Sequence, residues 1–383
     1  MLILETLLWF LAAAWGLTAV MALLNRLLLT PLPKEGTAAH LLPLSVVLPA
    51  RNEEAGIEEA VVAHCTQDYP DLEVVVVDDG STDSTPAILG RLSARFPNLR
   101  VIACGDPPEG WLGKPNALRA GLAATRGALV LFADADVVYG PGVHRRAASE
   151  MARSDLDILV FLPHQEGPCT VRLVVSALDA IGLYGVPSFL YNVQRLKGFG
   201  LGAGAGNLVR RSALEAAGGL EALRGEVVED IAMGRRLKAL RGKLRVVPAF
   251  DCVRVQMYAS LGQALEGFTK NAYAFLGFSP LRAALGLLAG FVISLLPAVV
   301  LAMAPLVPPA ILLPAAIAAG MGLALECWAC LWSGHGPWLA PLYPVRGLLW
   351  MGIVVRSAWR YHTKGLIWRG RGYGAVKGAG RRD

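Results

Sequence analysis

The sequence lacks the residue patterns of several common protein classes. Its six cysteines are scattered, and only Cys327 and Cys330 lie close together, inside an apolar stretch, where small reduced thiols are the plain interpretation. Its six histidines show no ligand spacing. The Gly-x-x-x-x-Gly-Lys-Ser/Thr loop of P-loop nucleotidases is also missing, although Lys114 follows a glycine. Disulfide frameworks, zinc sites and P-loop chemistry are therefore not supported.

Two long stretches lack charge altogether. The 383-residue chain is 54% hydrophobic, and neither residues 6–25 nor residues 283–325 contain a charged side chain. The first stretch is long enough to span a bilayer, and no small-residue cleavage site follows it, so residues 1–29 are predicted to be a retained anchor. The second is too long for one span, and Pro305, Pro308 and Pro309 interrupt it. We therefore expect spans at about 283–304 and 309–330.

A third apolar segment, 338–355, completes a predicted membrane region at 281–358. Pro341, Pro344 and Arg346 interrupt it, so either an interfacial or re-entrant helix or a full span fits. A basic tail, 359–383, follows. Since the net charge of +6 lies largely beside the apolar segments and in this tail, anionic lipid headgroups explain it better than nucleic acid. The positive-inside rule then places the middle of the chain in the cytoplasm of a multi-pass inner-membrane protein.

Residues 44–250 alternate short apolar runs with amphipathic stretches, which predicts an α/β domain with a mostly parallel sheet. The first four strands are expected at 44–48, 72–77, 99–103 and 128–132. Residues 251–280 are predicted to be an interfacial segment that leads into the membrane region. Terminal helices would thus flank a central soluble domain.

Polar residues follow three of these strands. Arg51 and Glu53 follow the first, Asp78 and Asp79 the second, and an Asp134-Ala-Asp136 motif the fourth. An isolated Asp-x-Asp is often only a solvated loop or a helix cap. In a parallel sheet, however, the carboxyl ends of the strands lie side by side and form the ligand crevice. Two carboxylates there are suited to a hard divalent cation held against phosphate oxygens.

Two further sites lie at predicted helix starts. Lys114 would place an ammonium beside the backbone N–H groups of a helix N-terminus, where a phosphate can bind, although an exposed surface lysine is the alternative. Glu229 and Asp230 precede an amphipathic helix. Acids in a first helical turn are stabilised by the helix dipole, so a structural role competes with that of a general base for an acceptor hydroxyl.

Taken in order, Ser45–Glu54, Val75–Ser81, Asp134–Asp136 and Glu229–Asp230 resemble the motifs of the family 2 inverting glycosyltransferases of GT-A fold. The resemblance implies a Rossmann-like domain that uses a nucleotide-sugar donor and Mg²⁺ or Mn²⁺. It implies that the residues contacting the nucleotide are Pro49, Arg51, Glu53, Asp78 and Asp79. It further implies that Lys114 lies near the ribose or diphosphate, that Asp134 and Asp136 bind the metal and the sugar diphosphate, and that Asp230, next to Glu229, is the base.

Within that class, the chain looks like membrane glycosyltransferases of hopanoid and carotenoid pathways, which implies a terpenoid or similar lipid acceptor. The donor or acceptor region would include Gly204, Gln256, Lys270, Trp368 and Arg371. Residues 171–193 are apolar enough either to admit an acceptor at the membrane interface or to form an ordinary core helix. Gly202–Gly206 could likewise line the sugar pocket or form a plain turn.

Three other functions remain open at this point. Processive polysaccharide synthases carry a Gln-x-x-Arg-Trp motif, and this chain has no Arg-Trp dipeptide, which makes polymer synthesis less favoured. A membrane-bound nucleotidyltransferase would need a basic glycine-rich loop after the first strand, where this chain has Glu53 and Glu54. A non-catalytic scaffold or transporter is the third. Few polar residues lie within the apolar spans, which argues against a transporter, and Glu326, near the end of a span, is the one ionisable candidate.

Overall fold

The computed structural model describes residues 2–36, 38, 40–363, 366–368 and 371–373. Its internal contacts divide the chain into two compact units. The sheet unit comprises Asn25–Glu166 and Ser188–Gln256. The helical unit comprises the described residues before Asn25, the segment Gly167–Pro187 and the described residues from Met257 onward. The central domain is thus not continuous in sequence, because Gly167–Pro187 packs with the terminal helices instead.

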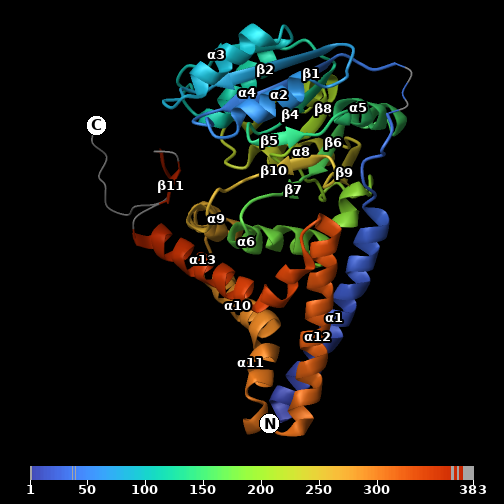
Figure 1. Cartoon of the computed structure of the whole chain (residues 1–383), viewed down its shortest axis with the longest axis vertical. Coiled ribbons are helices and arrows are strands. Elements are labelled where there is room, and N and C mark those ends of the chain that lie inside the picture. Colours follow the sequence, from blue (N-terminus) through green and yellow to red (C-terminus); the bar gives the residue numbers. More distant parts are fainter. Residues whose placement is uncertain (1, 37, 39, 364–365, 369–370, 374–383) are drawn as a thin grey trace. The chain divides into compact units, whose positions relative to one another are not determined.

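A seven-stranded sheet in the order β3-β2-β1-β4-β8-β6-β9 forms the centre of the sheet unit (Figure 1). Its strands are β1 (Leu44–Ala50), β2 (Leu72–Asp78), β3 (Leu99–Ala103), β4 (Leu129–Phe132), β6 (Ile158–Leu162), β8 (Asn207–Arg210) and β9 (Leu244–Pro248). β8 runs antiparallel to both of its neighbours, and the other pairs are parallel. The predicted α/β class with a mostly parallel sheet is confirmed.

Both faces of this sheet are buried, which explains why its strands are continuous apolar runs. In β1, Val46 and Leu48 belong to one hydrophobic cluster and Val47 to another, as the alternation of side chains along a strand requires. The first cluster includes residues of α2 (Ile57–Cys65), α3 (Thr85–Arg95) and α5 (Val143–Arg153). The second includes residues of α4 (Gly113–Ala123), α7 (Arg211–Ala216), η3 (Leu220–Leu223) and α8 (Glu229–Ala239).

A small second sheet joins β5 (Val137–Tyr139), β10 (Val253–Val255) and β7 (His164–Gln165). β5 begins directly after Asp136, so the acidic motif lies in the turn between the two sheets. Because β1 pairs in parallel with both β2 and β4, the residues that follow these three strands meet at one edge. That edge carries the acidic motifs.

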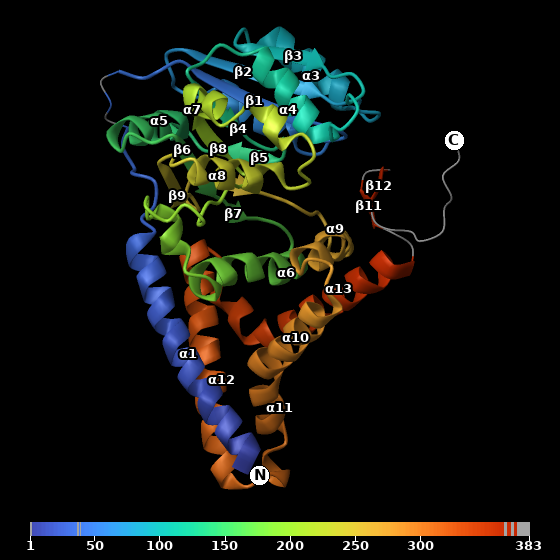
Figure 2. The same cartoon turned by 180° about the vertical axis from the view of Figure 1, so that it is seen from behind.

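The helical unit is built from long apolar helices, of which α1 (Leu2–Leu28) and α12 (Pro309–Ser333) run side by side in both views (Figures 1 and 2). Its other elements are α6 (Cys169–Ala180), η1 (Ile181–Gly185), α9 (Leu261–Phe275), α10 (Pro280–Gly290), η4 (Phe291–Leu295), α11 (Leu296–Ala302), η5 (Ala304–Leu306), η6 (Pro337–Leu342), α13 (Tyr343–Thr363), β11 (Leu366–Trp368) and β12 (Arg371–Tyr373). The 3₁₀-helix η2 (Ser188–Asn192) belongs to the sheet unit.

Four helices of the described chain are long and apolar enough to cross a membrane, judged by length and composition alone. They are Leu2–Leu28, Pro280–Ala302, Pro309–Ser333 and Pro337–Thr363. The last of these covers the segment 338–355, for which the sequence left two interpretations open. Most of the basic tail 359–383 lies outside the described residues.

Candidate active site

The Asp-x-Asp motif sits where β4 ends. The backbone N–H of Asp134 donates to the carbonyl oxygen of Gly204 at 2.9 Å, which ties the motif to the glycine-rich segment before β8. Asp134 is half-buried and lines a cavity with Lys114, Glu229 and Asp230. Three motifs that are far apart in sequence are therefore brought together.

Lys114 lies in the first turn of α4 and bridges two of these acids. Its Nζ is 2.7 Å from Asp134 Oδ1 and 2.7 Å from Glu229 Oε1. Burial alone would lower the pKa of this ammonium, but the carboxylates of Asp134 and Glu229, together with Asp230, hold the pKa well above its usual range. Lys114 is thus a permanent cation at the centre of an acidic cavity.

Glu229 and Asp230 form the first turn of α8. The N–H of Ile231 donates to Asp230 Oδ1 at 2.7 Å, and Glu229 is buried against Lys114. Burial raises the pKa of both carboxyls, and the Asp134 charge raises them further while Lys114 opposes the shift. A carboxylate whose pKa is raised is a stronger proton acceptor, which suits general base catalysis.

The segment Gly202–Gly206 fits closely around these acids. A Cβ on Gly202 would clash with the carbonyl oxygen of Asp230, and a Cβ on Gly204 would clash with the Asp134 carboxylate and lie 3.3 Å from Asp230 Oδ2. Only glycine lets the backbone approach two carboxylates this closely. Ala203 and Gly204 of this segment line the cavity.

Asn207 is a residue of this cavity that the sequence analysis missed. It is 1% exposed, its Oδ1 accepts from the N–H of Ala203 at 3.1 Å, and its Nδ2 donates to the carbonyl oxygen of Asp230 at 3.3 Å. One amide side chain thus joins the glycine segment to the acid pair. The only available signal was its position directly after Gly206 and at the start of a strand.

The residues expected at the nucleotide lie at the ends of β1 and β2. Arg51 Nη1 donates to the carbonyl oxygen of Asp79 at 2.8 Å and lies 3.4 Å from Asp79 Oδ2. Asp78 Oδ1 accepts from the N–H of Ser81 at 2.9 Å, which orders the sharp turn at Gly80. Asp79 is buried at this edge, with the Arg51 guanidinium beside its carboxylate.

Negative charge accumulates around Asp136. Burial raises the pKa of its carboxyl to about 7, and the charges of Asp134 and Glu53 add to the shift. Asp136 therefore changes its protonation state near neutral pH. A bound cation would remove this repulsion.

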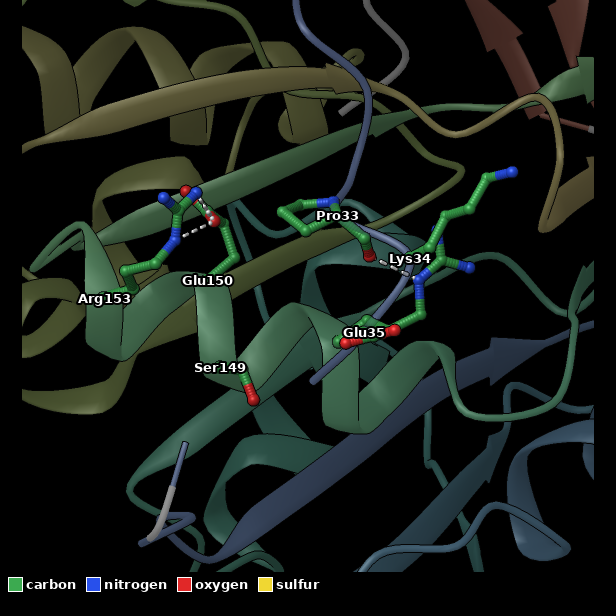
Figure 3. Close-up of a pocket in the computed structure, with 7 residues that line it drawn as sticks. Pro33, Lys34, Glu35, Ser149, Glu150 and Arg153 are labelled. Atoms are coloured by element: carbon green, nitrogen blue, oxygen red, sulfur yellow. Dashed lines mark hydrogen bonds and ion pairs between the residues drawn. The ribbon is translucent and has the colours of Figure 1, made fainter. Parts of the chain in front are cut away.

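The cavity lined by Lys114, Asp134 and Asp230 is nearly filled by its own side chains, since only about 10 Å³ remains for a water-sized molecule. A larger cavity of about 420 Å³ lies in the same unit between Pro33–Glu35 and α5 (Figure 3). There Arg153 pairs with Glu150, and Arg146 donates to the carbonyl oxygen of Pro33. None of the acidic motifs lines it.

The remaining predicted residues divide between the units. Pro49 lies in β1 and pairs in register with Val77 of β2, close to the nucleotide end, and Gln256 follows β10 in the sheet unit. Lys270 lies on α9, while Trp368 and Arg371 lie in β11 and β12, all in the helical unit. The structure therefore does not join these three to the acidic cavity within one compact unit.

No group of three or more His, Cys, Asp or Glu side chains among the described residues is arranged to hold a metal ion by itself. The cavity does have the chemistry of a shared site, because it offers carboxylate oxygens and more negative than positive charge. Magnesium and manganese are commonly held by one or two carboxylates together with substrate phosphates. The residues thus fit a cation that enters with a diphosphate.

The fold and this cavity together define a glycosyltransferase of the GT-A class. In structure, the chain is similar to the mannosyltransferase PcManGT from Pyrobaculum calidifontis, solved in complex with GDP-Man and Mn²⁺, with a TM-score of 0.56 and 18% identity over 93% of this chain and 99% of that one. At this identity the similarity establishes the fold alone. The predicted fold is confirmed.

The chain belongs to glycosyl transferase family 21, whose model matches residues 7–380. The sequence motifs resemble those of family 2, whereas the matching family model is that of family 21. The predicted enzyme class, a glycosyltransferase, is confirmed. The chain is 33% identical to a beta-monoglucosyldiacylglycerol synthase of Synechocystis sp. over 224 residues, 54% of this chain and 44% of that protein. It is 25% identical to the 4,4'-diaponeurosporenoate glycosyltransferase of Staphylococcus aureus over 242 residues, 60% of each. It thus spans about half the length of these relatives.

Proposed function

We propose that this protein transfers a sugar from a nucleotide diphosphate donor to a hydroxyl or carboxyl group of a membrane lipid, with inversion at the anomeric carbon. The observation that carries the proposal is the single cavity lined by Asp134, Lys114 and Asp230. In this cavity Asp134 would bind a metal cation, Lys114 the diphosphate, and Asp230 the proton of the acceptor. These are the components that a one-step displacement requires.

Asp230 is the proposed general base. It removes the proton from the attacking acceptor oxygen, and its raised pKa strengthens it for this task. The Lys114 ammonium stabilises the negative charge that develops on the departing diphosphate. Arg51 and Asp79, at the ends of β1 and β2, bind the nucleoside end of the donor.

A divalent cation, Mg²⁺ or Mn²⁺, would be held by Asp134 and Asp136 together with the donor's phosphate oxygens. When bound, it would neutralise leaving-group charge as a Lewis acid. Burial and the charges of Asp134 and Glu53 raise the pKa of Asp136, and a cation there would offset the charge repulsion. Lys114, which pairs with Asp134 and Glu229, would then contact the phosphates from the side of Glu229.

A lipid acceptor is supported by the names of the relatives, a beta-monoglucosyldiacylglycerol synthase and a 4,4'-diaponeurosporenoate glycosyltransferase. It is also supported by the four helices that can cross a membrane. Arg26 and Lys34 follow the first of these helices, and Arg282 lies at the start of the second. By the positive-inside rule, the catalytic unit faces the cytoplasm of a multi-pass inner-membrane protein.

The decisive experiment compares the full-length protein with the Asp230→Asn variant in nanodiscs. UDP- and GDP-hexoses would be tested as donors, and diacylglycerol and a carotenoid acid as acceptors. The wild type should form a glycolipid with an inverted anomeric configuration, read by NMR. Asp230→Asn should lose roughly 10²–10⁴-fold in turnover but still bind the nucleotide sugar. Retained turnover in this variant would exclude Asp230 as the base.

A further inference from the structure

The helical unit contains an ion pair inside its apolar packing. Glu326 of α12 is 3% exposed, and Arg346 of α13, also buried, donates to its Oε1. Their surroundings are apolar, since Leu325 and Ala329 on the same helix belong to a hydrophobic cluster with α1. Ionisable groups within candidate spans are costly to bury and usually have a function.

Most of the polar atoms of this pair are engaged. The Tyr184 hydroxyl of η1 donates to the same oxygen, Oε1 of Glu326, and Arg346 Nη1 donates to Ser176 Oγ of α6 at 3.2 Å. Residues of α13 and η1 thus bond the carboxylate on α12, and α6 holds the arginine of the pair. This fixes the position of Glu326 before any ligand arrives.

Two polar atoms in this region have no hydrogen-bond partner among the described residues. They are the second carboxylate oxygen of Glu326, Oε2, and the indole Nε1 of Trp15 on α1. Trp15 is 5% exposed. Leaving a buried polar atom unpaired costs about 1–3 kcal/mol, and more for a charged group. Two such atoms are therefore an unsatisfied feature that a ligand would complete.

The residues that carry these two atoms both contact Tyr184. The Trp15 ring packs edge-on against Tyr184 with centroids 5.9 Å apart, and the Tyr184 hydroxyl bonds Glu326. Trp15 also packs against Gly322, one helical turn before Glu326, where a Cβ would lie 3.2 Å from the indole. One atom is a donor and the other an acceptor, and a hydroxyl can both accept and donate.

We infer that Trp15 and Glu326 form a recognition site for the free hydroxyl of a neutral lipid headgroup within the helical unit. The indole N–H donates to the lipid oxygen, and the lipid hydroxyl donates to Glu326 Oε2. This deepens the proposed function and rests on it. A diacylglycerol acceptor has one free hydroxyl, so the site would hold the lipid before that hydroxyl reacts at Asp230. Glu326 lies seven residues before the end of α12, about 10 Å along the helix.

A neighbouring polar group serves as a matched control. His335 Nε2 and Asp179 Oδ2 are 3.0 Å apart, and Arg172 Nε donates to His335 Nδ1 at 3.3 Å. This group is also buried in the helical unit, but both ring nitrogens of His335 are engaged. Disturbing it should alter stability without altering lipid selection.

The test uses the full-length protein in phosphatidylcholine nanodiscs without any nucleotide sugar. A photoreactive diacylglycerol is the probe. Unlabelled diacylglycerol and its O-acetylated analogue, in separate samples, compete with the probe for crosslinking. The wild type should prefer the free hydroxyl by about tenfold, the effect of one to two hydrogen bonds. Trp15→Phe and Glu326→Gln should abolish this preference, while Asp179→Asn should keep it. Equal competition by both lipids in the wild type, or a preference that survives both substitutions, would overturn the site and leave water as its occupant.

Trp15→Phe alone decides the matter if Glu326→Gln does not fold, because Trp15 has no ionic partner to lose. The Asp230→Asn variant separates this inference from the proposed function. If it keeps the hydroxyl preference although no transfer is detected in the wild type, the lipid site stands and the proposed reaction falls. If transfer occurs but the wild type shows no hydroxyl preference, the reaction stands and the site falls.

Discussion

The two units both bury carboxylates beside a cation, but they balance the charge differently. In the sheet unit, Lys114 faces three carboxylates, so negative charge is in excess. In the helical unit, Arg346 and Tyr184 both address a single oxygen of Glu326. The first arrangement carries unbalanced negative charge, whereas the second pairs one carboxylate with one cation. Carboxylates beside a cation thus leave a net negative charge in the sheet unit and form a balanced ion pair in the helical unit.

Removing one partner of the fixed pair should have the largest effect on stability. Arg346→Met leaves Glu326 buried without its cation, and we expect a loss of about 3–5 kcal/mol in the free energy of unfolding. The double substitution Glu326→Gln with Arg346→Met removes both charges and should recover most of this loss. Thermal unfolding in nanodiscs measures both. A single variant as stable as the wild type would contradict the description of a balanced pair.

In the sheet unit, Lys114→Ala should affect turnover more than folding. In the proposed reaction the ammonium is one of the charges that stabilise the departing diphosphate, so we expect turnover to fall by about 10²–10³-fold without it. Lys114→Arg keeps the charge and should retain much of the rate. Steady-state kinetics with saturating donor gives the comparison. Equal rates in the alanine and arginine variants would show that the charge is not used.

The excess charge around Asp136 predicts a pH dependence. Because its pKa is about 7 in the folded protein, the apparent affinity for Mn²⁺ should rise with pH, by about tenfold per unit below pH 7, and level off above. The same shift means that the folded state holds this proton more tightly, so its contribution to stability falls as pH rises from about 4 to 7. Asp136→Asn should remove both slopes. Titration calorimetry and urea unfolding between pH 5 and 8 provide the measurements.

The smallest effect concerns the amide that joins the two walls of the cavity. Asn207→Ala removes the hydrogen bonds to Ala203 and Asp230, and we expect a loss of about 1–3 kcal/mol in stability. Because Asp230 would be less well held, turnover should fall while donor affinity changes little. Asn207→Leu, of similar size, controls for lost volume. If donor affinity falls instead of turnover, Asn207 acts on the donor and not on the base.

The sequence was sufficient for features that repeat along the chain. Alternating apolar runs predicted the sheet, and the carboxyl ends of parallel strands predicted that Asp79, Asp134 and Arg51 share an edge. The charge-free stretches predicted the apolar helices. These inferences rely on local patterns, and local patterns are visible without coordinates.

Features that depend on packing between distant segments were not visible in the same way. Asn207 carries no motif, and its role follows only from its contacts with Ala203 and Asp230. The composition of residues 171–193 fits a core helix and an interfacial segment equally well, because apolar residues can pack against either protein or lipid. In the structure, α6 of this segment packs against α12 and α13. Trp15 was likewise one apolar residue among many.

The interruption of the catalytic unit by Gly167–Pro187 affects how the protein can be made. During synthesis, α6 leaves the ribosome well before α9 and α13, which cover Val174 through Ala272 and Ile353. At ordinary translation rates this delay is on the order of ten seconds. Through that interval an apolar helix remains without its partners, so early insertion at the bilayer, or a chaperone, must shield it. For the same reason, a shortened chain ending at Gln256 should aggregate unless a polar linker replaces this segment.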